Sequence, residues 1–133
     1  MVDTHVTYLD ASAIVKIIAP ERESDALIAW LLARRPLATS VIARVEVARA
    51  LLRMRLGPAA REHALISAID EIPLSLAVVE RAATLMPAEV RSLDAIHLAS
   101  AIEVGSDLEA FVTYDRRMAD AARGLGLPVV SPA

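Results

Sequence analysis

Short runs of β-branched and aliphatic residues alternate along the chain with longer segments of helical periodicity, and this alternation restricts the fold more than any other feature. The runs that predict strands cover residues 6–9, 37–39, 72–74, 110–113 and 129–130. Strands that alternate with helices typically form a parallel sheet that helices cover on both faces. The sequence therefore predicts an α/β fold, a three-layer α/β/α sandwich around a parallel sheet of four or five strands.

Capping and breaking residues give the expected limits of the helices. Helices are predicted at 13–19, 23–34, 41–55, 59–69, 76–85, 93–103 and 116–123. The expected N-caps, whose side-chain oxygens can accept hydrogen bonds from backbone N–H groups, are Ser12, Ser40, Ser75, Ser92 and Asp115. Pro73 lies within the third predicted strand and indicates an edge position, since proline cannot donate to a neighbouring strand.

Length and composition exclude several classes of protein. The 133 residues fit one domain, taken as residues 1–133, and the absence of cysteine excludes disulfides, thiol catalysis and zinc–thiolate sites. The net charge of −3 is not a general nucleic-acid footprint, so any contact with RNA must be local. No signal peptide and no membrane span are recognisable, and we expect a cytoplasmic protein.

Four acidic residues lie near the ends of predicted strands. Asp10 follows the first strand directly, and Asp115 follows the fourth by two residues. Glu46 and Asp94 lie in early turns of the helices at 41–55 and 93–103. In a right-handed parallel arrangement all four project toward the same end of the sheet. Each acid alone also has a purely structural explanation, as a helix cap or as a partner of a helix dipole or a nearby arginine.

Acids that gather in one place need a counter-charge. Apolar neighbours flank Asp10, Glu46 and Asp94, which indicates partial burial. A pair of like charges about 4 Å apart costs roughly 4 kcal/mol at an effective dielectric of about 20. The cluster must therefore bind a proton or a cation, and carboxylate oxygens select Mg²⁺ or Mn²⁺ over Zn²⁺.

Four motifs resemble those of PIN-domain ribonucleases. They are Tyr8–Ala13, Ser40–Val47, Leu93–Ala99 and Val112–Met118, and the ending Gly126–Val130 is also similar to the family. The likeness covers nearly the whole chain and is nearest to the short VapC toxins of bacterial VapBC toxin–antitoxin pairs. The third motif is the most specific.

The resemblance implies a metal-dependent endoribonuclease that inhibits translation and growth until a VapB-type antitoxin neutralises it. It implies a catalytic and Mg²⁺- or Mn²⁺-binding site, and the acids that carry over to it are Asp10, Glu46, Asp94 and Asp115. The implied products have 5′-phosphate and 3′-hydroxyl ends, and the implied substrate is an RNA of the tRNA or rRNA class. Some PIN nucleases have a further acid where this chain has Arg117, so four ligating acids are expected here.

Other polar residues adjoin the motif acids. Those expected to support the acids by hydrogen bonds, as a second shell, are Ser12, Ser40, Thr113 and His97. Arg116 and Arg117 adjoin Asp115 and are candidates for contact with RNA phosphates, since a guanidinium group matches phosphate geometry. A solvated helical surface is the alternative for both arginines.

Other folds that use acids or phosphates lack their required residues here. A phosphotransfer receiver needs a late lysine, but the chain has only Lys16. A haloacid-dehalogenase phosphatase needs a second acid at Ser12, and a dinucleotide-binding fold needs glycines before Gly57. The remaining alternative is a non-catalytic module that binds RNA or protein with the same fold.

The helices at 23–34 and 41–69 carry more apolar residues than a small domain usually covers. The candidates for exposure are Leu27, Leu31, Leu51, Leu52, Met54, Leu56 and Leu65. Exposed apolar patches usually mark interfaces. We therefore expect a symmetric homodimer, with an antitoxin segment near the same helices.

Overall fold

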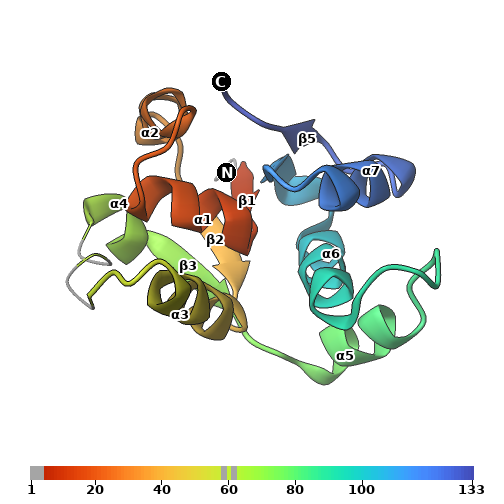
Figure 1. Ribbon diagram of the computed structural model, residues 1–133. Helices are drawn as coiled ribbons and strands as arrows, with labels where there is room; N and C mark the ends of the chain where they lie inside the picture. The colour runs from red at the N-terminus through yellow and green to blue at the C-terminus, as the bar shows by residue number, and fades with distance from the viewer. Residues whose placement is uncertain (1–4, 58–59, 61–62) are drawn as a thin grey trace.

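The structure is a computed structural model that describes residues 5–57, 60 and 63–133, and a parallel sheet forms its centre (Figure 1). Within this part of the chain the strands are β1 Val6–Leu9, β2 Leu37–Ser40, β3 Ile69–Ile72, β4 Leu108–Val112 and β5 Val129–Val130. They form one five-stranded sheet in the order β3-β2-β1-β4-β5, and every pair is parallel. The α/β fold and the parallel sheet expected from the sequence are confirmed.

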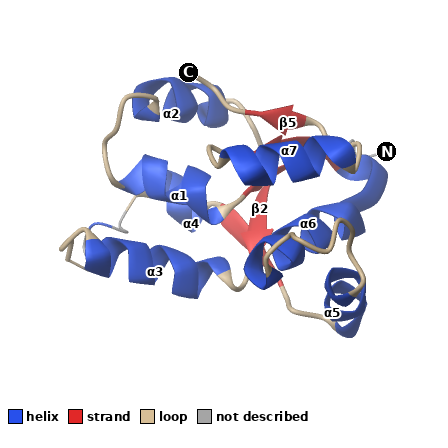
Figure 2. Cartoon of the chain, turned by 45° about the vertical axis from the view of Figure 1, so that its right-hand side comes forward, coloured by secondary structure: helices blue, strands red, loops and turns tan. Residues whose placement is uncertain are grey.

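Helices cover both faces of this sheet (Figures 1 and 2). They are α1 Ala11–Ile18, α2 Ser24–Leu32, α3 Ala43–Arg53, α4 Ala64–Ser67, α5 Leu76–Ala83, α6 Ser92–Val104 and α7 Arg116–Gly124, with a short 3₁₀ turn at Gly105–Asp107. Helices α1 to α4 lie on one side, and α5 to α7 lie on the other. None of the described helices is long and apolar enough to cross a membrane.

Two hydrophobic cores lie between the sheet and its helices. Leu9 belongs to the core on the α1 side, together with Leu27 of α2. Its neighbour Tyr8 belongs to the other core, with Leu98 of α6 and Phe111 of β4. Successive strand residues point to opposite faces, so β1 contributes to both cores. A strand between two covered faces has no solvent side, and all four residues of β2 are buried accordingly.

The predicted helix at 59–69 and the third predicted strand are both displaced. The described α-helix there covers only Ala64–Ser67, while residues 58–59 and 61–62 lie outside the described residues. Strand β3 begins at Ile69, where a helix was expected, because residues 69–72 pair in register with β2. Pro73 follows this strand and ends it, and β3 is an edge strand as predicted.

Three of the expected caps are also placed differently. Asp10, not Ser12, caps α1, and its carboxylate accepts the Ala13 N–H. Ser40 lies within β2, and α3 begins only at Ala43. Ser92 is the first residue of α6, not its cap. Asp115 does cap α7, as predicted. The two motif aspartates that follow strands therefore both cap the next helix.

The order of the strands determines where a site can lie. From β1 the chain builds the sheet outward through β2 to β3, and then returns to the other side of β1 with β4 and β5. Ligands bind α/β sheets at such a switch point, beyond the carboxyl ends of the strands. The ends of β1 and β4 lie side by side, and the Asp10 N–H donates to the Val112 carbonyl at 3.2 Å.

The expected exposure of apolar side chains is only partly right. Four of the candidates are buried in the core, namely Leu27, Leu31, Leu51 and Leu65, because they face α1 or the sheet. The others, Leu52, Met54 and Leu56, are exposed. A second exposed group, which the sequence did not indicate, consists of Leu74, Leu76, Val79, Met86 and Leu93 around α5 and the start of α6.

Candidate active site

A pocket of about 400 Å³ at the switch point is lined by all four motif acids. Asp10 comes from the end of β1, Glu46 from α3, Asp94 from the first turn of α6 and Asp115 from the cap of α7. We call this the acidic pocket. No three Asp, Glu or His side chains of the described chain are grouped there closely enough to form a metal site as they lie.

Asp10 is the most constrained of the four acids. Its carboxylate is 2% exposed and accepts hydrogen bonds from the Ser12 hydroxyl at 2.6 Å, the Ala13 N–H at 3.0 Å and the Thr113 hydroxyl. Burial raises the pKa of Asp10, although these hydrogen bonds oppose the rise. Three donors on a buried carboxylate leave it little freedom to turn.

The Ser12 and Thr113 hydroxyls, which donate to Asp10, also hold the loop that carries Asp115. Ser12 Oγ accepts the Tyr114 N–H at 3.0 Å, and Thr113 Oγ1 accepts the Asp115 N–H at 3.1 Å. The structure thus shows both hydroxyls in hydrogen bonds around the acids. They fix the position of Asp115 relative to Asp10 across the β1–β4 boundary.

Glu46 is held from inside the protein by a chain of two hydrogen bonds. His97 Nε2 lies 2.6 Å from Glu46 Oε1, and His97 Nδ1 lies 2.7 Å from the Tyr8 hydroxyl. Burial raises the pKa of Tyr8, so its hydroxyl keeps its proton and can donate to Nδ1. His97 then donates from Nε2 to the Glu46 carboxylate. The imidazole is fully buried, and its two hydrogen bonds hold the Glu46 carboxylate in one orientation.

Neither Asp94 nor Asp115 forms an ion pair with a described residue. Burial raises the pKa of Asp94, and the negative charge of Asp115 raises it further, although the charge of Arg91 lowers it to a minor extent. Asp115 is exposed, and its Oδ1 accepts the N–H groups of Arg117 and Met118 at 2.9 and 3.2 Å. This side of the pocket therefore carries negative charge without a partner.

Two basic residues line the acidic pocket, and sequence reasoning did not identify them as part of the site. The Lys16 ammonium forms ion pairs with Glu21 at 3.0 Å and Glu23 at 2.7 Å and lies 4.8 Å from the centre of the Tyr114 ring. Its charge is thus already balanced. Arg53 lies on the α3 wall. The signal for Lys16 was its position four residues after Ser12, on the same face of α1.

The structure does not bring every candidate residue into the acidic pocket. Ser40 accepts the Ile42 N–H at 3.3 Å in the turn before α3 and does not line the pocket, because β2 ends with its side chain beneath that turn. Arg116 and Arg117 are exposed at the start of α7 and line two different neighbouring hollows.

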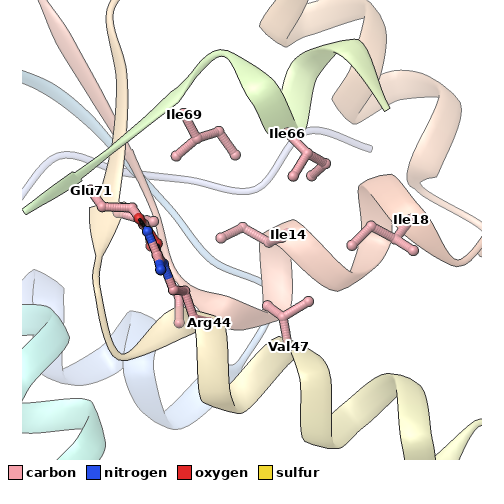
Figure 3. Close-up of a pocket in the computed structure, with 9 residues that line it drawn as sticks. Ile14, Ile18, Arg44, Val47, Ile66, Ile69 and Glu71 are labelled. Atoms are coloured by element: carbon pink, nitrogen blue, oxygen red, sulfur yellow. Dashed lines mark hydrogen bonds and ion pairs between the residues drawn. The ribbon is translucent and has the colours of Figure 1, made fainter. Parts of the chain in front are cut away.

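A separate apolar pocket of about 240 Å³ lies between α1, α3, α4 and β3 (Figure 3). Its lining is mainly aliphatic and includes Ile14, Ile18, Val47, Ile66 and Ile69. At one end, Arg44 Nε donates to both carboxylate oxygens of Glu71 at 2.8 and 2.7 Å. The charges in this pocket are therefore paired with each other.

A family comparison agrees with the geometry of the acidic pocket. The model of the PIN domain family matches residues 7–124, which include all four acids. The chain belongs to the PIN-domain family. Among relatives of this PIN-domain protein is Ribonuclease VapC46 of Mycobacterium tuberculosis, 46% identical over 128 residues that cover 95% of this chain and 97% of that one.

Solved structures share the same fold. A toxin–antitoxin complex from Klebsiella pneumoniae has a chain that matches with a TM-score of 0.70 and 23% identity, over 96% of this chain and 98% of that one. VapC20 of Mycobacterium tuberculosis, described as a toxin that cleaves the sarcin–ricin loop, matches with a TM-score of 0.73 and 18% identity, over 95% and 99%. At these identities the likeness shows the PIN fold.

Proposed function

We propose that residues 1–133 form a single PIN domain that is a metal-dependent endoribonuclease, the toxin of a toxin–antitoxin pair. One observation carries the proposal: carboxylates from the end of β1, from α3, from α6 and from the start of α7 line one pocket at the switch point of the sheet. The ribonuclease name of a relative at 46% identity supports RNA cleavage. A module that only binds RNA or protein would have no need of four carboxylates in that pocket.

The donor atoms of the acidic pocket suit a hard divalent cation, although its carboxylates would have to move closer together to share one. The pocket offers carboxylate oxygens, which Mg²⁺ and Mn²⁺ prefer, and the chain has no thiolate to offer. A cation near Asp94 would offset the repulsion between this carboxylate and Asp115. We propose that the ion is held by Asp10, Glu46, Asp94 and Asp115. When bound, it would activate a water molecule and stabilise charge on the attacking and leaving oxygens.

The protein's own residues divide the remaining work. Asp10 is immobilised by three donors, and Glu46 is oriented by His97, so these two carboxylates form the rigid part of the site. Asp94 and Asp115 provide the uncompensated negative charge. Ser12 and Thr113 fix the position of Asp115 relative to Asp10. Such pre-organisation lowers the cost of positioning a phosphodiester for attack.

Contacts with RNA would come from the rim of the acidic pocket. Arg116 and Arg117 are exposed beside Asp115, and their guanidinium groups suit phosphate oxygens. Attack by water leaves a 5′-phosphate and a 3′-hydroxyl and does not use the RNA 2′-hydroxyl as nucleophile. Products with 2′,3′-cyclic phosphate ends would contradict this mechanism.

A VapB-type antitoxin is the proposed protein partner. The Klebsiella chain with this fold was solved in a toxin–antitoxin complex. Exposed Leu52, Met54 and Leu56 at the end of α3 leave an apolar surface near the acidic pocket for such a partner. An arginine or lysine of the antitoxin would compete with metal for the carboxylates. The other exposed apolar group, around α5, supports a homodimer, which sedimentation at micromolar concentration would test.

The test is an RNA-cleavage assay on tRNA and rRNA fragments with Mg²⁺, with Mn²⁺ or with a chelator. We expect cleavage only with metal and no cleavage by Asp10→Asn. Asp70→Asn is the matched control, because Asp70 is an exposed residue of edge strand β3 and lines none of the pockets described above. Equal cleavage by Asp10→Asn and Asp70→Asn would overturn the proposal and favour a binding module.

A further inference from the structure

A third hollow continues from the acidic pocket along α7, and we call it the flanking hollow. It has a volume of about 540 Å³, within the range of roughly 300–1,000 Å³ typical of small-ligand sites. Its walls are the loop before α6, residues 86–91, and the outer side of α7. Asp94 and Met118 line both this hollow and the acidic pocket, so the two are continuous.

Two arginines that form no ion pair with a described residue line the flanking hollow. Arg91 is the residue just before α6, three positions before Asp94, and Arg117 lies in the first turn of α7. Both are exposed, and neither forms an ion pair with any described residue. By contrast, Arg81 is paired with Glu103 and Arg123 with Asp120. The arginines beside Asp94 therefore keep their full hydrogen-bonding capacity for a ligand.

The rest of the lining is mostly apolar. Met86, Val90 and Leu125 form a surface without aromatic rings, and Met86 is 67% exposed. Such a surface suits the face of a nucleobase, which also stacks on guanidinium planes where aromatics are absent. Besides Asp94, two further acids line the hollow: Asp120 is paired with Arg123 at 3.6 Å, while Glu89 remains as an opposing charge.

We infer that the flanking hollow binds the RNA nucleotide next to the scissile phosphodiester, with Arg91 and Arg117 holding its phosphate and the apolar wall contacting its base. This inference rests on the proposed ribonuclease function. An RNA strand with one phosphate in the acidic pocket must continue into an adjoining space, and the flanking hollow shares Asp94 with that pocket. Arg116 is not part of it, since it lines a hollow on the other side of Asp115 together with Arg123.

Binding of fluorescein-labelled single-stranded RNA, measured by anisotropy in Ca²⁺ at several salt concentrations, tests the assignment. Arg91→Ala and Arg117→Ala should each weaken binding about tenfold, the worth of one charge-assisted hydrogen bond. Each should also reduce the slope of log K against log salt by about 0.7, as expected for one lost phosphate contact on a single strand. Arg81→Ala is the control and should leave the slope unchanged, because Arg81 is already paired with Glu103 and lines neither the acidic pocket nor the flanking hollow.

Two further measurements separate base contact from charge. Glu89→Gln should strengthen RNA binding, because it removes the opposing charge in the flanking hollow. In an oligonucleotide substrate, removal of the base on one side of the scissile bond should raise KM for the wild type but have less effect in Arg91→Ala, because a nucleotide whose phosphate is no longer held places its base less well against the apolar wall. A purely structural role for the arginines would change neither the salt slope nor this dependence on the base.

The possible failures are distinguishable. If the wild type cleaves RNA but Arg91→Ala and Arg117→Ala bind like Arg81→Ala, the flanking hollow is wrongly assigned and the proposed function stands. If these variants lose only antitoxin binding, the hollow belongs to the protein partner and the inference is wrong. If the wild type neither binds nor cleaves RNA, the proposed function and the inference both fail.

Discussion

The acidic pocket and the apolar pocket are built by the same two helices, with different faces. In α1, Ser12 and Lys16 face the acidic pocket, whereas Ile14 and Ile18 face the apolar one. In α3 the same division separates Glu46 from Val47. A helix turns by about 100° per residue, so neighbours in sequence can belong to sites of opposite character. Chemistry here is decided by helix face and not by sequence proximity.

The two pockets also treat charge differently. In the apolar pocket the described charges, Arg44 and Glu71, satisfy each other through several hydrogen bonds. In the acidic pocket, Asp94 and Asp115 repel each other, and neither forms an ion pair with a described residue. Uncompensated charge costs stability and is retained where activity needs it. Changes in the acidic pocket should therefore affect activity more than stability, and changes in the apolar pocket should do the reverse.

The largest effect is expected for Asp94→Asn. Loss of a proposed metal ligand should remove several kcal/mol of transition-state stabilisation, a fall in rate on the order of a thousandfold. The metal-free protein should become more stable, because the substitution removes a carboxylate that Asp115 repels. RNA cleavage and thermal unfolding in chelator would be compared with those of Asp70→Asn. Addition of Mg²⁺ should raise the Tm of the wild type more than that of Asp94→Asn. A large loss of stability in chelator would mean that Asp94 has a structural role.

Ile14→Ala should have the opposite pattern. The Ile14 side chain is buried in the core and borders the apolar pocket, so its truncation should lower the free energy of unfolding by about 2 kcal/mol, near the lower end for such changes. The rate per folded molecule should stay close to that of the wild type. Urea unfolding and active-site-normalised cleavage would measure the two quantities. A fall in rate larger than the loss of folded protein would show that the two pockets are coupled.

Sequence patterns could predict the acidic pocket because its acids occupy special positions. Asp10 directly follows β1, Asp115 comes three residues after the end of β4, and parallel topology brings those strand ends to one edge. The apolar pocket could not be predicted from the sequence, since Ile14, Val47 and Ile69 have the same hydrophobic periodicity as ordinary core residues. Whether such residues fill a space or border one depends on packing, and hydrophobic periodicity does not carry that information.

The errors in the predicted fold have related causes. Residues 69–72 contain apolar and acidic residues that are compatible with a helix or a strand. They form a strand because they pair with β2. The burial of Leu27, Leu31, Leu51 and Leu65 was missed because helix periodicity gives the apolar face but not what covers it. His97 was expected beside the acids, but the partner on its inner side, Tyr8, is 89 residues away and could not be inferred.

Tyr8→Phe tests whether the buried side of the acidic pocket matters. Loss of the hydroxyl leaves His97 Nδ1 without its donor and should loosen the orientation of Glu46. Partners of this kind contribute about 10–100-fold to metal affinity or activity, and we expect the lower figure here because the imidazole remains packed. The readouts are the Mg²⁺ midpoint and the split between kcat and KM. In a Glu46→Gln background the effect of Tyr8→Phe should nearly vanish. An equal effect in both backgrounds would mean that Tyr8 acts only through stability.

The smallest effect is expected at the ion pair that ends the apolar pocket. The hydrogen bonds from Arg44 hold the pKa of Glu71 below its ordinary value, so this carboxylate stabilises the fold when it is ionised. Its contribution is present above the ordinary Glu pKa of about 4.3 and is lost as the pH falls through the lower pKa of the folded state. The Arg44 side chain is largely solvent-accessible and the Glu71 side chain is partly so, and ion pairs this open to solvent contribute little to stability. Glu71→Gln should thus lower Tm slightly at neutral pH and not at all once Glu71 is protonated in the wild type. Cleavage at neutral pH should be unchanged, because this pocket lacks the unpaired charge on which the acidic pocket depends. A Tm difference that stays constant down to acidic pH would show that the carboxylate charge of Glu71 does not stabilise this end of the apolar pocket.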